Sequence, residues 1–249
     1  MSRKNWTKKE TIVAFNVYCK VPFKASSKTN PIIIQFANII GRTPSALNMK
    51  IGNFGRLDPE LKKKGITGLK NGSQLEEEVW NEFHGNWDKL AFESEKIIAE
   101  FVGKPILGEF DGEFPVGKDT MRATKVRVNQ AFFRSAVLSA YNSSCCITGI
   151  NIPQLLVASH IIPWNQNKER TNPRNGLCLN CLHDKAFDKG LITINEDYRI
   201  EVSSHVLDSV NSGVMEYLHR IAGNKIFLPD RFLPYKQFLA YHRRNIFIK

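Results

Sequence analysis

Long apolar runs are missing from this chain of 249 residues. No run approaches the roughly 18 residues that a bilayer-spanning helix needs, and the amino-terminal stretch MSRKNWTKKE lacks the apolar core of a signal peptide. Cysteine is scarce as well, because the chain has five, an odd number that favours reduced thiols or metal ligation over a disulfide framework. These absences predict a cytoplasmic protein with no membrane partner.

Acidic residues are few at the start of the chain. Residues 1–70 hold 14 Lys and Arg against 3 Asp and Glu, whereas residues 71–102 hold 2 against 8. The net charge of the whole chain is +11, which favours a polyanionic partner, either nucleic acid or acidic lipid. One interpretation is a basic face that meets phosphates. The other is a solvated basic surface with no partner.

Length and composition suit two globular domains. Hydrophobic residues make up 42% of the chain and charged residues 24%, and 249 residues are enough for two modest cores. Residues 103–121 contain several glycines and two prolines with little periodicity, and we interpret them as a linker. We therefore predict a helical DNA-recognition domain over 1–102 and a second domain over 122–249.

Helix start signals recur in the first domain. Thr7 and Glu10 have the spacing of a capping box, and the pairs Asn30-Pro31 and Thr43-Pro44 each place proline at a first helical position. Gly41 separates the second predicted helix from the third, as in a helix-turn-helix.

Basic residues accompany the third predicted helix, and the candidate DNA contacts are Arg42, Lys50 and Arg56. The stretch IGRTPSALNMKIGNF resembles the third-helix region of Myb-like or trihelix DNA-binding domains, and also the amino-terminal modules ahead of some bacterial restriction nucleases. The alternative is that the helices simply pack together and the basic side chains are solvated.

The second domain contains a strand-like run, LLVASHIIPW, then a polar loop, a short strand GLCLN and a helix through HDKAFDKG that ends at Gly190. On that helix Asp184 and Asp188 are four residues apart and share one face. Two carboxylates on one helical turn suit a hard divalent cation that keeps several waters. The following LITINEDYRIEVS alternates around a turn and predicts a hairpin.

From about residue 122 to 249 the chain resembles an HNH nuclease domain of the ββα-metal type, and CCITG, ASHIIPW, NPRNGLCL, HDKAFDKGLI and LPYKQFLAYHRRNIF are similar to bacterial HNH endonucleases of restriction type. Such families set a general-base His 14 or 15 residues before an Asn and a metal ligand nine residues after it, and His160, Asn175 and Asp184 have spacings of 15 and 9. The resemblance implies an α+β fold in which His160 and Asn175 are catalytic and Asp184 and Asp188 bind metal.

Three features depart from the family pattern. Ser159 stands where an acidic or histidine metal ligand is common. His183 is expected to project from a different side of the helix than Asp184, toward a phosphate or solvent. Many HNH domains carry a structural zinc ion on two cysteine pairs, but the first pair in this chain is adjacent, so small buried side chains are favoured over zinc ligands for Cys145, Cys146, Cys178 and Cys181.

The resemblance implies a restriction endonuclease of host defence that hydrolyses double-stranded DNA with Mg²⁺ or Mn²⁺. Because a nuclease with one site needs two copies to cut both strands, we expect a homodimer. Two alternatives stay open. One is a modification-dependent nuclease that recognises methylcytosine or hydroxymethylcytosine, and the other is a catalytically inactive DNA-binding regulator with an HNH fold, which Ser159 suggests.

Overall fold

The computed structural model describes residues 5–66, 72–104 and 118–249, and side chains from residue 123 onward in the last range. The chain divides into two compact units, Met1–Ser139 and Ala140–Lys249. Most of the predicted linker, residues 105–117, lies outside the described residues. The helix that follows it, α7 (Lys118–Ala140), belongs to the first unit as far as Ser139, so the second unit begins later than residue 122.

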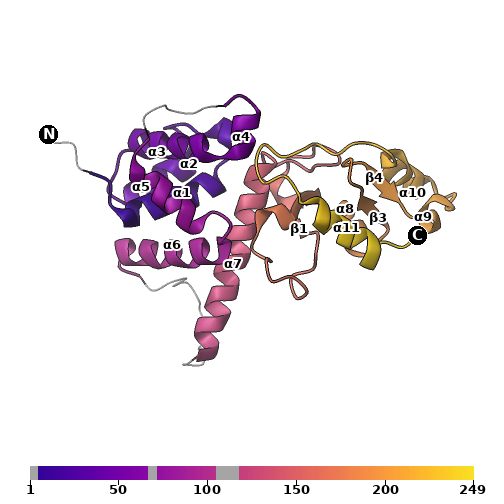
Figure 1. Ribbon diagram of the computed structural model, residues 1–249. Coiled ribbons are helices and arrows are strands. Elements are labelled where there is room, and N and C mark those ends of the chain that lie inside the picture. The colour runs from indigo at the N-terminus through magenta and orange to yellow at the C-terminus, as the bar shows by residue number, and fades with distance from the viewer. Residues whose placement is uncertain (1–4, 67–71, 105–117) are drawn as a thin grey trace. The chain divides into compact units, whose positions relative to one another are not determined.

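Helices build the first unit (Figure 1): α1 (Lys8–Lys20), α2 (Pro31–Ile39), α3 (Pro44–Leu57), α4 (Pro59–Lys63), α5 (Gln74–Phe83), α6 (Trp87–Val102) and α7. Their predicted starts are confirmed, because Thr7 and Glu10 form the capping box, and the Asn30 and Thr43 side chains accept backbone N–H groups ahead of proline. The short α4 is capped by the Asp58 carboxylate, which accepts a hydrogen bond from the Glu60 amide.

The core of the first unit surrounds α1. The Phe15 ring centroid lies 4.8 Å from that of Phe54 on α3 and 5.1 Å from that of Trp80 on α5. The Trp87 ring on α6 in turn lies 6.4 Å from the ring of Phe132 on α7. These aromatic contacts join the helices into one core.

Two small antiparallel sheets and several helices build the second unit, which confirms the α+β fold. Strands β1 (Leu156–His160) and β2 (Gly176–Asn180) pair with His160 opposite Gly176, and α8 (Cys181–Asp188) follows β2 directly (Figure 1). Strands β3 (Ile192–Ile194) and β4 (Ile200–Val202) form the predicted hairpin. The remaining helices are α9 (Ser204–Leu207), α10 (Ser212–Tyr217) and α11 (Lys236–Asn245).

The last residues of the chain pack against the end of α8. Gly190 has a φ of +69°, and a Cβ atom there would lie 2.0 Å from the carbonyl oxygen of Ile246. The Gly190 carbonyl accepts a hydrogen bond of 2.9 Å from the Ile248 amide. Only glycine therefore fits between the end of α8 and this tail.

Helix α11 holds α8 through His242. The Nε2 atom of His242 donates to the Phe187 carbonyl at 3.1 Å, and its Nδ1 atom lies 2.9 Å from the Thr193 hydroxyl. The His242 ring also stacks on Phe187 with centroids 3.7 Å apart. The α11 helix thus fixes the carboxyl-terminal half of α8 against β3. Among the described residues, no helix has the length and apolar character to cross a membrane.

Candidate active site

His160 is the last residue of β1 and is partly buried. Its Nε2 atom lies 3.1 Å from the backbone carbonyl oxygen of Arg170, in the loop that joins β1 to β2. Because a carbonyl only accepts, this bond places the imidazole proton on Nε2 and the lone pair on Nδ1. Burial lowers the pKa of His160 to about 4, and the Arg170 carbonyl opposes the shift. The ring is therefore neutral at pH 7.

Asn175 is fully buried at the start of β2 and holds the backbone that follows His160. Its Oδ1 atom accepts a hydrogen bond of 2.9 Å from the Ile162 amide, and its Nδ2 atom donates to the Ile162 carbonyl at 3.0 Å. The Asn175 carbonyl also accepts from the Ile161 amide at 2.9 Å. These three bonds end β1 at His160, whereas the sequence suggested a strand as far as residue 164. They give Asn175 the tethering geometry expected of it, and its part in catalysis stays a prediction.

The two aspartates of α8 influence each other. Burial raises the pKa of Asp184, and burial followed by the negative charge of Asp184 raises that of Asp188. The hydroxyl of Ser159 lies near Asp184 and lowers the pKa of that carboxyl group, without a hydrogen bond of normal geometry. Ser159 is the residue before His160, so β1 places its end beside the carboxylates of α8.

The donors around α8 fit a hard divalent cation. Burial raises the pKa of both carboxylates although the charge of Lys185 opposes the shift, and the buried Ser159 hydroxyl has no hydrogen-bond partner among the described residues. Mg²⁺ commonly takes one or two carboxylates and completes its shell with water. No group of three or more His, Cys, Asp or Glu side chains that could hold a metal ion occurs in the part of the chain the structure describes. The predicted pair would therefore need further oxygen ligands from water and substrate.

The cysteines do not gather as a zinc site in the described ranges. Cys145, Cys146 and Cys178 are buried, as expected of small core side chains, but Cys181 is exposed, and its thiol lies 3.3 Å from the Leu155 carbonyl. The expectation of burial is wrong for Cys181, which is exposed at the first position of α8.

His183 is buried rather than exposed, which corrects the expectation from helical spacing. Its Nε2 atom lies 3.3 Å from the Tyr217 carbonyl oxygen. Burial raises the pKa of the Cys145 thiol, but the polar groups of His183 and Thr148 near it outweigh burial and lower that pKa to about 7. His183 thus faces the turn at residues 145–148 and not a phosphate site.

Residues 145–195 match the family model for HNH endonucleases. The match includes both strands of the β1–β2 hairpin and all of α8, and so all four predicted site residues of the second unit. The HNH segment supports a nuclease that acts on DNA. A search of curated proteins found no match to the chain.

Outside the HNH segment, the three predicted DNA contacts form ion pairs within the first unit. Arg42 pairs with Glu10 at 2.8 Å, and Lys50 pairs with Glu76, with every one of these four side chains less than a tenth exposed. Arg56 pairs with Glu77 at 3.0 Å. Arg42 and Lys50 also lie 4.8 Å from the Trp6 ring centroid. DNA contact by these cations stays a prediction, and their internal acidic partners argue against it.

Two neighbours of His160 in the HNH segment were not predicted from the sequence. The Trp164 ring meets the His160 ring edge to face at 5.4 Å, and the Arg170 guanidinium lies 5.1 Å from the Trp164 centroid. Trp164 belongs to the motif ASHIIPW, so its position near His160 could have been predicted from the sequence. The contact of the Arg170 carbonyl could not, because every residue has a backbone carbonyl.

Proposed function

We propose that the protein is a metal-dependent endonuclease that hydrolyses phosphodiester bonds of double-stranded DNA, with His160 as general base. The carrying observation is the placement of His160 within the HNH segment, where the Arg170 carbonyl orients the ring and the preceding residue lies beside Asp184. Restriction of foreign DNA in the cytoplasm is the cellular role we propose, with the first unit helping to bind the duplex.

The chemistry requires a deprotonated water and neutralisation of the charge that the phosphate gains in the transition state. With its proton directed from Nε2 to Arg170, a neutral His160 would accept the water proton on Nδ1. Asp184 and Asp188 would hold a divalent ion, Mg²⁺ or Mn²⁺, which when bound supplies positive charge to the phosphate and the leaving 3′ oxygen. Asn175 would keep the ring aimed by fixing Ile162.

Supercoiled plasmid incubated with the full chain tests the proposal. We expect nicking and linearisation with Mg²⁺ or Mn²⁺, none with EDTA, and none for His160→Ala under the same conditions. Arg220→Ala removes an exposed cation of the same unit that pairs with Glu216, and it should cut at the parental rate. Cutting by His160→Ala at the parental rate would remove His160 from its role.

One alternative rests on Ser159. A serine in place of an acidic or histidine ligand weakens the metal site, so a DNA-binding regulator without catalysis would be the second candidate. Such a protein would retain DNA but leave plasmid intact at every enzyme concentration and with either metal. If the protein is such a regulator, Ser159→Asp should produce cutting only when His160, Asp184 and Asp188 are already correctly placed.

Modification dependence and the homodimer need tests of their own. Digestion of methylated, hydroxymethylated and unmodified DNA side by side distinguishes an ordinary restriction nuclease from a modification-dependent one. Sedimentation of the chain with and without duplex would show whether two copies assemble on DNA, as cutting of both strands by one-site subunits requires.

A further inference from the structure

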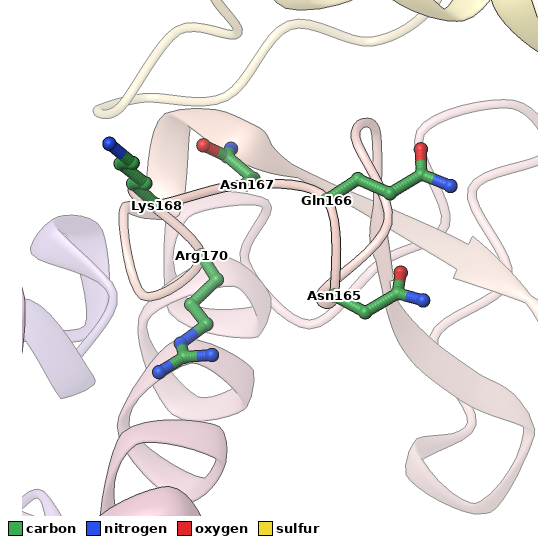
Figure 2. Close-up of a pocket in the computed structure, with 5 residues that line it drawn as sticks. All are labelled: Asn165, Gln166, Asn167, Lys168 and Arg170. Carbon is green, nitrogen blue, oxygen red and sulfur yellow. The ribbon is translucent and has the colours of Figure 1, made fainter.

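The loop between β1 and β2 lines an open, polar surface pocket of about 430 Å³ within the second unit. Its lining consists of three carboxamides and two cations, Asn165, Gln166, Asn167, Lys168 and Arg170. Figure 2 shows the Asn165 and Gln166 side chains on one arm of the loop and the Lys168 and Arg170 side chains on the other. The carboxamides of Asn165 and Gln166 thus extend from one arm, and the cationic ends of Lys168 and Arg170 extend from the other arm in different directions (Figure 2).

One donor in the pocket is unused. The Asn167 Oδ1 atom accepts a hydrogen bond of 2.9 Å from the Glu169 amide, which holds the side chain in place. Its Nδ2 atom is buried and has no hydrogen-bond partner among the described residues. Because leaving a buried donor unpaired costs free energy, a fixed donor of this kind is suited to an acceptor from a ligand.

Hydrogen bonds hold two other side chains of the loop, Gln166 and Glu169. Tyr241 on α11 donates its hydroxyl to the Gln166 Oε1 atom at 2.9 Å, which leaves the Gln166 amide group as the donor end of that side chain. Glu169, the acidic residue of the loop, accepts from Asn172 at 2.8 Å. Its charge is thus partly engaged away from the two cations.

Arg170 connects the pocket to the proposed base. Arg170 supplies the carbonyl that binds His160 Nε2, and its guanidinium stacks over Trp164, whose ring meets His160 edge to face. A ligand that contacts Arg170 is therefore linked to the His160 ring through the Trp164 side chain.

We propose that this pocket binds the nucleotide next to the scissile phosphate. Lys168 and Arg170 bind its phosphate oxygens, and the Asn167 and Gln166 amide groups donate to acceptors on its base edge. Carboxamides commonly recognise base edges, and Lys and Arg commonly bind phosphates. The volume lies within the range of roughly 300–1,000 Å³ typical of small-ligand sites. The proposal rests on the nuclease function and adds a substrate subsite to it.

Duplex binding by the full chain in the His160→Ala background, with Ca²⁺ in place of Mg²⁺, measures the pocket without cleavage. Lys168→Ala and Arg170→Ala should each weaken binding about tenfold at low salt and each reduce the salt slope by about one. Arg170→Lys keeps the charge and should restore most of the salt slope. Arg220→Ala, which removes an exposed cation elsewhere in the unit, should change affinity less than about twofold.

Asn167→Asp tests the unused donor separately. It keeps the oxygen that accepts from the Glu169 amide and removes the buried Nδ2 donor, so folding should persist while DNA binding weakens about tenfold or more. Thermal unfolding of each variant checks the fold. If the parent cuts DNA while these variants bind duplex as tightly as His160→Ala alone, the pocket assignment is overturned and the nuclease stands. If the parent neither binds nor cuts DNA, both proposals fail.

Discussion

The carboxamide of Asn175 exchanges two hydrogen bonds with the backbone of Ile162, one with its amide and one with its carbonyl. Asn175 lies 13 residues further along the chain, and its side chain fixes the turn that follows His160. The proposed general base is therefore the last residue of β1, and Asn175 is the residue just before β2, the partner strand of the same hairpin. The position of the imidazole depends on an amide that never needs to touch the substrate.

Asn175→Ala removes both of these bonds and leaves two buried backbone groups unpaired. We expect the free energy of unfolding to fall by about 2–4 kcal/mol, from about 1–2 kcal/mol per unpaired group, and cleavage to fall about 100-fold because the ring loses its orientation. Urea unfolding and a plasmid assay measure the two effects. Asn245→Ala, which loses an exposed bond to the Tyr241 carbonyl, is the control and should lower stability by less than about 0.5 kcal/mol. Unchanged cleavage by Asn175→Ala would contradict the tether.

The pH dependence of cleavage should report His160. Burial lowers its pKa to about 4 in the free protein, so the base is already neutral at pH 5 and kcat/KM should fall only near pH 4. A bound phosphate brings negative charge near the ring and raises the pKa, so the acid limb of kcat should lie at higher pH than that of kcat/KM. Rates measured on an oligonucleotide duplex from pH 4 to 8 check this order. Coincident limbs near pH 6.5 would mean that the ring is not buried in the working enzyme.

The charges of Asp184 and Asp188 should lower the stability of the metal-free protein. Their raised pKa values mean that the ionised forms are less stable in the folded chain than in the unfolded one, so the cost is present at neutral pH and disappears as pH falls below the folded pKa values. Asp188→Asn should raise the Tm of the metal-free protein only slightly, because the exposed carboxylate is screened by solvent, and it should abolish Mg²⁺-dependent cutting. Mn²⁺ or Mg²⁺ should raise the Tm of the parent but not of Asp188→Asn. A lower Tm for the metal-free variant would count against this assignment.

Acid stability of the second unit should depend on His242. Burial lowers the pKa of His242 to about 4, whereas the unfolded residue titrates near its usual value of about 6.5. The unfolded chain therefore binds a proton first, and stability is full above about pH 6.5 and falls as pH decreases to about 4. The loss at this residue approaches about 3 kcal/mol. His242→Phe should flatten part of this slope in urea unfolding at pH 7, 5.5 and 4.5, and the part due to His160 should remain. An unchanged slope would show that the pKa of His242 in the fold lies close to its value in the unfolded chain.

Lys50 provides a test of the first unit. Its ammonium group is buried against Glu76, so Lys50→Ala removes the nearest cation from a buried carboxylate. The cost should be about 3 kcal/mol of stability, at the low end for a broken buried pair, because Arg56 still lies 4.0 Å from Glu76. The double variant Lys50→Met with Glu76→Leu removes both charges and should recover most of that loss. DNA affinity of the double variant, measured below its Tm, should equal that of the parent. A large loss of DNA affinity in a correctly folded double variant would instead indicate that Lys50 contacts DNA.

Features with local causes were predictable from the sequence. The helix starts at Thr7, Asn30 and Thr43 depend on bonds between residues two to four apart, and the β1–β2 hairpin with α8 follows from the spacing of its motifs. Partners far along the chain were not visible. Glu10 pairs with Arg42 across 32 residues, and Lys50 reaches Glu76 across 26.

The same limit applies to His183, whose helical position suggested exposure. Its partner, the Tyr217 carbonyl, lies 34 residues away in α10, and no local pattern announces it. Charge and spacing indicate which side chains are able to perform chemistry. Tertiary packing decides which of them are left accessible to perform it.

The close packing at Gly190 makes the end of α8 sensitive to changes in the residues after Asn245. The tail that crosses it is sandwiched against the end of the helix that carries both aspartates, with no space for a methyl group between them. An affinity tag appended after Lys249 would therefore follow directly on the segment that packs against the end of this helix. Truncating the chain after Asn245 would remove the Ile248 amide that donates to the Gly190 carbonyl, and it would weaken the packing of α8. Low activity of a tagged or truncated preparation would then reflect the altered tail and not the residues of the proposed site.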